Sequence, residues 1–190
     1  MVNKIGILAL QGNFEQHKKM FDILGVDNIF IRYSCDVEKC DAIVIPGGES
    51  TTMSKQIDRN NLRYVLQEYS KTNPLFGTCA GMILLSSTNG STNLQPLGIM
   101  DFTVNRNAYG RQIESFSDNL QLDFCEDTDF HAFFIRAPKI SKIGKSIKIL
   151  AKYKKQPVMI TDGRHFVTTF HPEIGSDIRI HNYFIEKINA

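Results

Sequence analysis

The first half of the chain alternates short runs of apolar, β-branched residues with segments of helical period. These runs lie at residues 5–10, 28–33, 42–45 and 75–76, and we expect each to form a strand. Between the first two, one helical face repeats through Phe14, His17, Phe21 and Leu24, and Gly25 follows as a stop signal. Because parallel strands are joined by helical crossovers of this kind, the pattern predicts a parallel sheet covered by helices.

Two more helices are expected on either side of the fourth run. Leu62, Leu66 and Tyr69 share one face, with Asn60 or Asn61 as the N-cap. The segment 80–85 is apolar on nearly every side, so we expect this helix to be buried at the centre of the fold.

From residue 99 to residue 170 the pattern changes to short runs rich in Phe, Ile, Val and Thr, separated by turn signals. This pattern predicts mostly antiparallel strands added to the same sheet. A last helix is expected after Ser176, its N-cap, with one face formed by Ile178, His181, Ile185 and Ile188. At about 150 residues per domain, 190 residues predict a single domain over 1–190.

Composition and charge exclude several classes of function. Hydrophobic residues make up 42% and charged residues 22%, as in ordinary globular proteins. The net charge of +2 is too small to predict a nucleic-acid or membrane partner. No apolar run approaches the roughly 18 residues of a membrane span and no secretory leader is visible, so a cytoplasmic location is expected. The four cysteines show no CxxC spacing, which argues against a metal site or a disulfide.

Cys79 lies in the segment FGTCAG, residues 76–81, between an expected strand and the buried helix. A nucleophile on a tight strand-to-helix turn needs small residues two positions before and after it, and Gly77 and Gly81 occupy those positions. The start of the following helix favours the thiolate. Taken alone, the segment fits an ordinary buried thiol equally well.

The segment FHPE, residues 170–173, offers the base that a cysteine nucleophile requires. In extended backbone His171 and Glu173 project to the same side, so Glu173 can fix the tautomer of the imidazole. The alternative is a surface histidine near a solvated glutamate. The cysteine turn elsewhere in the chain favours the catalytic interpretation.

The segment IPGGEST, residues 45–51, follows the expected strand at 42–45. Ligands of open α/β sheets bind at such carboxyl ends of strands. Its two glycines let the backbone approach a substrate, and we expect the N–H groups of Gly48 and Ala80 to form an oxyanion hole. The alternative is a tight turn with Ser50 or Thr51 capping the next helix, and both roles can coexist.

Together these three segments resemble the class I glutamine amidotransferases, in which a Cys-His-Glu triad releases ammonia from glutamine. Three runs single out the vitamin B6 branch, the glutaminase subunits of pyridoxal 5′-phosphate synthases: PGGESTT at 46–52, RNxYGRQxxSF at 106–116 and FIRAP at 134–138. The resemblance extends along nearly the whole chain. It implies a three-layer α/β/α, flavodoxin-like fold with a mostly parallel central sheet and added antiparallel strands.

By this resemblance, Cys79 is the nucleophile, His171 the general acid/base and Glu173 its orienting partner. Implied substrate contacts are Gly48, Glu49, Ser50, Arg106, Ile135 and Arg136. An arginine suits the α-carboxylate of free glutamine, whereas a surface or structural ion pair is the alternative for Arg106 and Arg136. The implied partners are L-glutamine and a synthase subunit in a hetero-oligomer, without a metal or other cofactor.

Three other functions stay open on the sequence. The chain could be the glutaminase subunit of another class I amidotransferase, serving a different synthase. It could be a non-catalytic sensor or scaffold on the same fold. It could also be a cysteine peptidase or a γ-glutamyl hydrolase. The intact Cys79, His171 and Glu173 argue against the non-catalytic alternative.

Overall fold

The computed structural model describes residues 4–88, 94–105 and 115–189. Within these residues, nine strands form one sheet in the order β2 (Asn28–Ile31), β1 (Ile5–Leu8), β3 (Ala42–Ile45), β4 (Leu75–Thr78), β12 (Phe166–Thr168), β11 (Gln156–Thr161), β10 (Lys148–Tyr153), β7 (Phe116–Leu122) and β8 (Cys125–Phe134). A separate three-stranded sheet contains β5 (Ser86–Thr88), β6 (Met100–Asn105) and β9 (Lys139–Ile143). The helices of the described residues are α1 (Phe14–Ile23), α2 (Ser34–Val37), α3 (Ser50–Arg59), α4 (Leu62–Ser70), α5 (Ala80–Leu85) and α6 (Arg179–Asn189).

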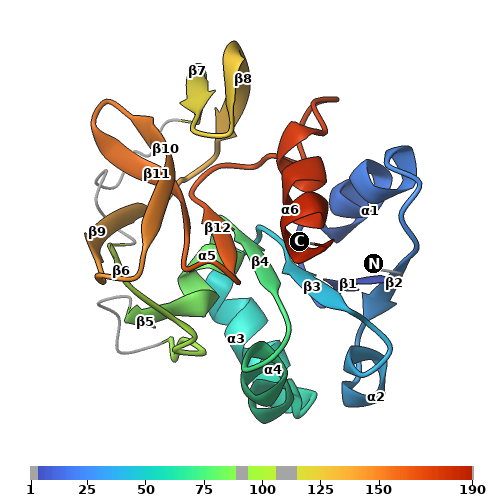
Figure 1. The fold of residues 1–190 in the computed structure, drawn as a ribbon. Coiled ribbons are helices and arrows are strands. Elements are labelled where there is room, and N and C mark those ends of the chain that lie inside the picture. The colour runs from blue at the N-terminus through green and yellow to red at the C-terminus, as the bar shows by residue number, and fades with distance from the viewer. Residues whose placement is uncertain (1–3, 89–93, 106–114, 190) are drawn as a thin grey trace.

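The first five strands of the large sheet are parallel. The sequence predicts this for the first four, whereas β12 lies in the part of the chain that was expected to be antiparallel. Consecutive side chains of β1 and β3 point to opposite faces, because side chains alternate along a strand. Ile5 and Ile7 pack with α1 and α6, whereas Leu8 packs with α3, α4 and α5. Figure 1 shows these two groups of helices on opposite sides of the sheet. Apolar residues on both faces therefore produce the expected three layers.

The second half of the chain only partly follows the prediction. The strands β7, β8, β10 and β11 are antiparallel and extend the large sheet, so its antiparallel part is as extensive as its parallel part. The strands β6 and β9 do not join this sheet, and β12 pairs parallel with β4. One face of β6 buries Met100, Phe102 and Val104 in the cluster that surrounds α5. The small sheet therefore covers a helix that is apolar on every side.

Helix ends also differ from the expectations. Asn61 holds the N-cap position of α4, but its side chain makes no capping hydrogen bond, and its φ of +54° turns the chain from α3 into α4. Ser176 is exposed and is not the N-cap of α6, which begins at Arg179. The buried face of α6 centres on Ile180, His181 and Phe184 because the Phe184 ring packs against Phe76 and Phe166.

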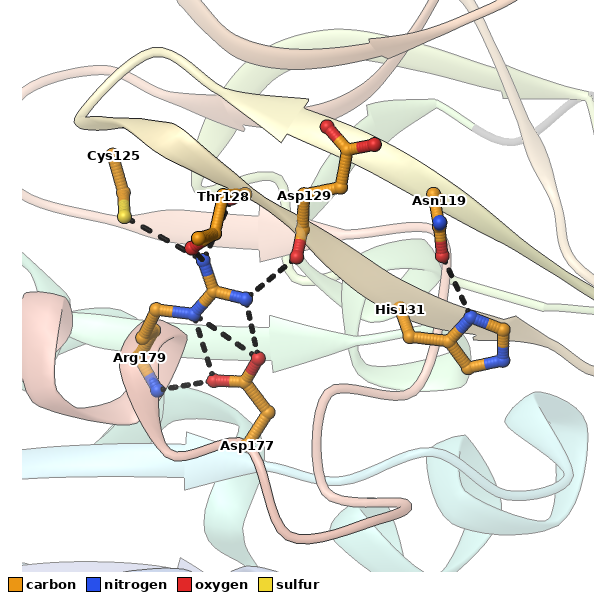
Figure 2. A network of polar contacts seen from close by, with 7 residues as sticks. All are labelled: Asn119, Cys125, Thr128, Asp129, His131, Asp177 and Arg179. Carbon is orange, nitrogen blue, oxygen red and sulfur yellow. Dashed lines mark hydrogen bonds and ion pairs between the residues drawn. The ribbon is translucent and has the colours of Figure 1, made fainter.

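The start of α6 is tied to the β7–β8 hairpin through one arginine (Figure 2). The Arg179 guanidinium pairs with the carboxylate of Asp177 and donates to the carbonyl oxygens of Thr128 and Asp129 in β8, at 2.8 Å each. On the hairpin itself, His131 and Asn119 face each other across the ladder and share a 2.8 Å hydrogen bond. The parallel and antiparallel parts of the molecule are thus joined by a side-chain contact as well as by the sheet.

Candidate active site

Cys79 occupies a strained turn between β4 and α5. Its backbone φ of +47° lies in a region that residues other than glycine rarely adopt. A Cβ added to Gly77 would lie 2.8 Å from the backbone of Gly81, and one added to Gly81 would lie 1.9 Å from the carbonyl oxygen of Ile45. Only glycine fits at either position, so the small residues flanking Cys79 have the steric role that the sequence suggested.

His171 reaches Cys79 through the pairing of two central strands. β12 runs parallel to β4 with Thr168 opposite Thr78, and the Cys79 N–H donates to the Thr168 carbonyl at 2.8 Å. Both strands end at the same edge of the sheet, which brings together residues that are 92 positions apart. The His171 N–H then donates to the Phe133 carbonyl at 2.9 Å, which fixes the backbone beyond β12.

Glu173 lies beside His171 and is buried with it. The distance between His171 Nδ1 and Glu173 Oε1 is 2.6 Å, and Glu173 is 1% exposed. Asn13 Nδ2 donates to the same carboxylate oxygen at 3.3 Å. The side chains of His171 and Glu173 therefore project to the same side, as predicted for extended backbone. Both are buried, so the alternative of a surface histidine near a solvated glutamate is excluded.

The two groups are held as a pair of opposite charges. Burial disfavours the imidazolium, yet interactions with Cys79 and with the Glu173 carboxylate outweigh it and raise the pKa of His171 to about 10. Burial also disfavours the carboxylate, but His17 and the hydrogen bond from His171 outweigh it and lower the pKa of Glu173 to about 2. A cationic His171 next to Cys79 is the arrangement that favours a thiolate nucleophile.

The glycine turn after β3 packs directly on this pair. A Cβ added to Gly47 would lie 2.3 Å from His171 Cε1 and 3.4 Å from Cys79 Cβ. The Gly47 carbonyl accepts from the Asn13 N–H at 2.9 Å, and Gln11 Oε1 accepts from the Glu49 N–H at 2.7 Å. The turn is therefore held against Cys79 by the loop between β1 and α1.

Glu49 caps the helix that follows the turn. Its carboxylate accepts from the N–H groups of Thr51 and Thr52, at 3.0 and 2.6 Å. The prediction that Ser50 or Thr51 caps this helix is wrong, because both residues lie inside α3. The longer Glu49 side chain reaches the free N–H groups of the first turn from the position before them.

A cavity of about 720 Å³ opens over these residues. Its lining includes Gly48, Glu49, Ser50, Cys79, Ala80, Ile135, Arg136 and His171. Cys79 Sγ donates to the Ile135 carbonyl at 3.7 Å, and Arg136 adopts a positive φ of +46°. Of the expected substrate contacts, Arg106 lies outside the described residues, and all the others border this cavity.

The chain matches the SNO glutamine amidotransferase family over residues 7–190. The chain belongs to this family. Membership confirms the class that the GTCAG and HPE segments predict, and it makes the chain a glutamine amidotransferase.

Individual relatives agree with this membership, and solved structures agree with the fold. Pyridoxal 5′-phosphate synthase subunits PdxT from Thermosipho africanus and Exiguobacterium sibiricum are each 44% identical to the chain over 97% of its length, and the matches cover 98% and 95% of those proteins. A solved glutamine amidotransferase structure is 35% identical, with a TM-score of 0.92 over 98% of this chain and 99% of the other. PurLQS from Thermotoga maritima, at 12% identity, has a TM-score of 0.75 over 98% and 99% of the two chains and confirms the fold.

In this member of the SNO family, three side chains near the triad positions had no functional assignment from the sequence. Asn13 contacts Glu173, and so does His17, whose Nε2 lies 3.5 Å from Glu173 Oε2. His181 lies behind His17. The two histidines appeared only as members of apolar helix faces. Within the described residues, no group of His, Cys, Asp and Glu side chains could hold a metal ion, and no helix there is long and apolar enough to cross a membrane.

Proposed function

We propose that this amidotransferase hydrolyses L-glutamine through Cys79, His171 and Glu173 and supplies the ammonia for pyridoxal 5′-phosphate synthesis. The observation that carries the proposal is the meeting of Cys79 and His171 at the ends of two paired strands, with Glu173 2.6 Å from His171. The cavity over Cys79 provides room for the substrate.

In the proposed reaction, the Cys79 thiolate attacks the side-chain carbonyl carbon of glutamine. The N–H groups of Gly48 and Ala80 stabilise the resulting tetrahedral oxyanion. The His171 imidazolium then gives its proton to the leaving nitrogen, and the carbon–nitrogen bond breaks to release ammonia and leave a γ-glutamyl thioester on Cys79. Neutral His171 next takes a proton from water, which attacks the thioester and frees glutamate.

Free glutamine carries a carboxylate and an ammonium group on its α-carbon, and these orient it in the cavity. Arg136, which lines the cavity, and Arg106 are the proposed partners of the α-carboxylate. Gly48, Glu49 and Ser50 also line the cavity, and Ile135 offers a backbone carbonyl. Because Glu49 also caps α3, a change there would affect the turn as well as the substrate.

The proposed partner is the synthase subunit of a pyridoxal 5′-phosphate synthase, because the relatives at 44% identity carry the name of a subunit of that enzyme. The chain would form a hetero-oligomer with it and act in the cytoplasm. We propose that docking adjusts the Gly47–Gly48 turn through Gln11 and Asn13, which hold the turn from the neighbouring loop. Glutamine would then be hydrolysed at an appreciable rate only when the synthase subunit is bound.

The decisive experiment measures glutamate released from glutamine by the chain with and without the synthase subunit. We expect activity to rise with the partner and to disappear in Cys79→Ala. Cys40→Ala is the matched control, because Cys40 is also a buried thiol but donates to the Asp36 carbonyl, away from the cavity. Cys79-dependent activity without any response to the partner would indicate a different synthase. Activity that survives Cys79→Ala would overturn the proposed triad.

A further inference from the structure

Two fully buried histidines lie behind Glu173 and are not used in the reaction described above. His17 comes from α1 and His181 from α6, two helices that lie side by side in Figure 1. His17 Nδ1 and His181 Nε2 are 2.9 Å apart. The other ring nitrogen of His17, Nε2, is 3.2 Å from Thr78 Oγ1 and 3.5 Å from Glu173 Oε2. His17 therefore contacts both the carboxylate and the residue before Cys79.

The hydrogen bond between the two rings contains one proton, which leaves two arrangements of tautomers. In the first, His181 Nε2–H donates to His17 Nδ1, and His17 Nε2–H points to Thr78 and Glu173. In the second, His17 Nδ1–H donates to His181, a bare His17 Nε2 faces the carboxylate, and His181 Nδ1 carries a proton. No partner for His181 Nδ1 exists among the described residues.

The first arrangement is favoured on two separate grounds. A lone pair on His17 Nε2 would face the negative charge of Glu173, whereas an N–H there is attracted to it. A buried N–H without an acceptor costs about 1–3 kcal/mol, and orphaned donors are rarer in proteins than orphaned acceptors. Burial also lowers the pKa of both rings, to about 3 for His181, so both are neutral and each carries one proton.

We propose that His17 and His181 form a positioning pair in which His181 fixes the tautomer of His17 and the His17 Nε2–H holds the second oxygen of the Glu173 carboxylate. This inference rests on the proposed function of the triad. Glu173 Oε1 is held by His171 and Asn13. Glu173 Oε2 makes no hydrogen bond that meets standard geometry within the described residues, and His17 is its ion-pair contact.

The positioning pair has a consequence for the pH dependence of the reaction. The titratable groups that face Glu173 are His17 and His171, and those that face His17 are Glu173, His171 and His181. Without a donor at His17 Nε2, the Glu173 carboxylate loses stabilisation and takes up a proton at a higher pH. The acid limb of the kcat profile then moves to higher pH, because a protonated Glu173 no longer orients His171.

The first test reads the tautomers directly in the folded chain labelled with ¹⁵N-histidine. We expect the ¹⁵N chemical shifts to show His17 and His181 neutral at pH 7, each with its proton on Nε2. A proton on Nδ1 of His17, or an imidazolium at either ring, would overturn the proposal. This readout does not depend on turnover, so it remains decisive even if the proposed glutaminase activity fails.

The second test compares two amide variants of His17 in the complex with the synthase subunit. His17→Gln places an amide N–H near the position of Nε2, whereas His17→Asn places its amide near Nδ1 and leaves Glu173 Oε2 without a donor from position 17. We expect His17→Asn to lower kcat about tenfold to a hundredfold with little change in KM, as loss of an orienting partner does. We expect His17→Gln to retain most of the activity and the original acid limb.

His165→Asn is the control for loss of a buried histidine. His165 Nδ1 accepts from the Leu75 N–H at 3.1 Å, a contact that an asparagine oxygen can keep. Equal kcat values and equal pH profiles for the two His17 variants would assign His17 a merely structural role and refute the proposal. If both His17 variants fail to fold, the ¹⁵N measurement on the unaltered chain decides the question.

Discussion

Two histidines contact Glu173 and a third, His181, lies behind one of them, and the charge of each depends on its surroundings. Burial lowers the pKa of His17 and His181, so these rings remain neutral. His171 is buried as well, but its contacts with Cys79 and Glu173 outweigh burial and raise its pKa. One buried anion is thus matched by one buried cation. If His17 or His181 were also protonated, the desolvation cost of that second buried cation would not be offset by a further carboxylate.

The lowered pKa of His181 predicts how stability depends on pH. The unfolded His181 binds a proton below about pH 6.5, whereas the folded one does so only near pH 3, so unfolding takes up one proton between these values. Stability then falls by about 1.4 kcal/mol for each pH unit of acidification in this window. His181→Phe, which keeps an aromatic ring beside Phe21 and Phe76, is expected to reduce the slope by the share that His181 contributes, while the buried His17 keeps its own share. Urea unfolding at pH 5, 6 and 7.5 measures it, and an unchanged slope would contradict the assignment.

Single residues were predictable from the sequence where a local motif carries the signal. Cys79 stands between glycines that a strained turn requires, and Glu173 stands two residues after His171. No local signal marks the contacts of Asn13 with Glu173 or of His17 with His181, which join positions 160 and 164 residues apart. The sequence places both histidines on apolar faces, and only the packing of α1 against α6 brings their rings together.

At the scale of elements, α5 packs closely on β3 where Gly81 lies against the Ile45 carbonyl. Gly81→Ala is expected to destabilise the fold by about 3 kcal/mol, because the new methyl group would lie 1.9 Å from the Ile45 carbonyl oxygen and force backbone to move. The free energy of unfolding in urea measures this loss. The Cys79 turn should shift as well, so glutamine turnover is expected to fall with stability.

Gly25→Ala is the matched control for this prediction. Gly25 has a positive φ of +67°, but an added Cβ meets nothing within 4 Å. We expect a loss of about 1 kcal/mol there, from backbone strain alone. An equal loss for the two variants would show that steric contact between α5 and β3 does not govern the effect.

In the parallel half, the first four strands were predictable because they are apolar, and α1 and α4 because they carry a clear helical period. The short α2 was not predicted. Elements that pair or pack with segments far away in the sequence could not be placed from the sequence. β6 alternates buried and exposed residues, as a strand with one solvated face does, and its sequence does not show that it covers α5 instead of extending the large sheet. The N-cap of α3 was missed because Glu49 replaces the usual short capping side chain.

For the whole molecule, Arg179 is a polar contact that holds the β7–β8 hairpin to α6, beside the stacked rings of Phe124 and Tyr183. Arg179→Met removes the guanidinium fork, and we expect amide hydrogen exchange in the hairpin to accelerate about tenfold, because a charge-assisted network of this kind is worth more than one neutral hydrogen bond. Exchange measured by mass spectrometry on hairpin peptides gives the result. The core strands β1, β3 and β4 are expected to keep their protection.

Arg164→Met provides the comparison, since Arg164 donates to the Ser70 and Lys71 carbonyls at the other end of the molecule. We expect it to leave exchange in β7–β8 unchanged. Faster exchange throughout the molecule in Arg179→Met would mean that the arginine stabilises the fold as a whole and has no particular effect on the hairpin.

The pairing of β4 with β12 also determines when the protein becomes active during its synthesis. A ribosome completes the Cys79 turn long before it reaches β12, and the partner that Cys79 N–H requires, the Thr168 carbonyl, does not yet exist. In the proposed mechanism, a nascent chain that ends short of His171 carries the nucleophile without its base. Glutamine hydrolysis by this mechanism requires translation to pass β12, so we expect incomplete chains to consume no glutamine.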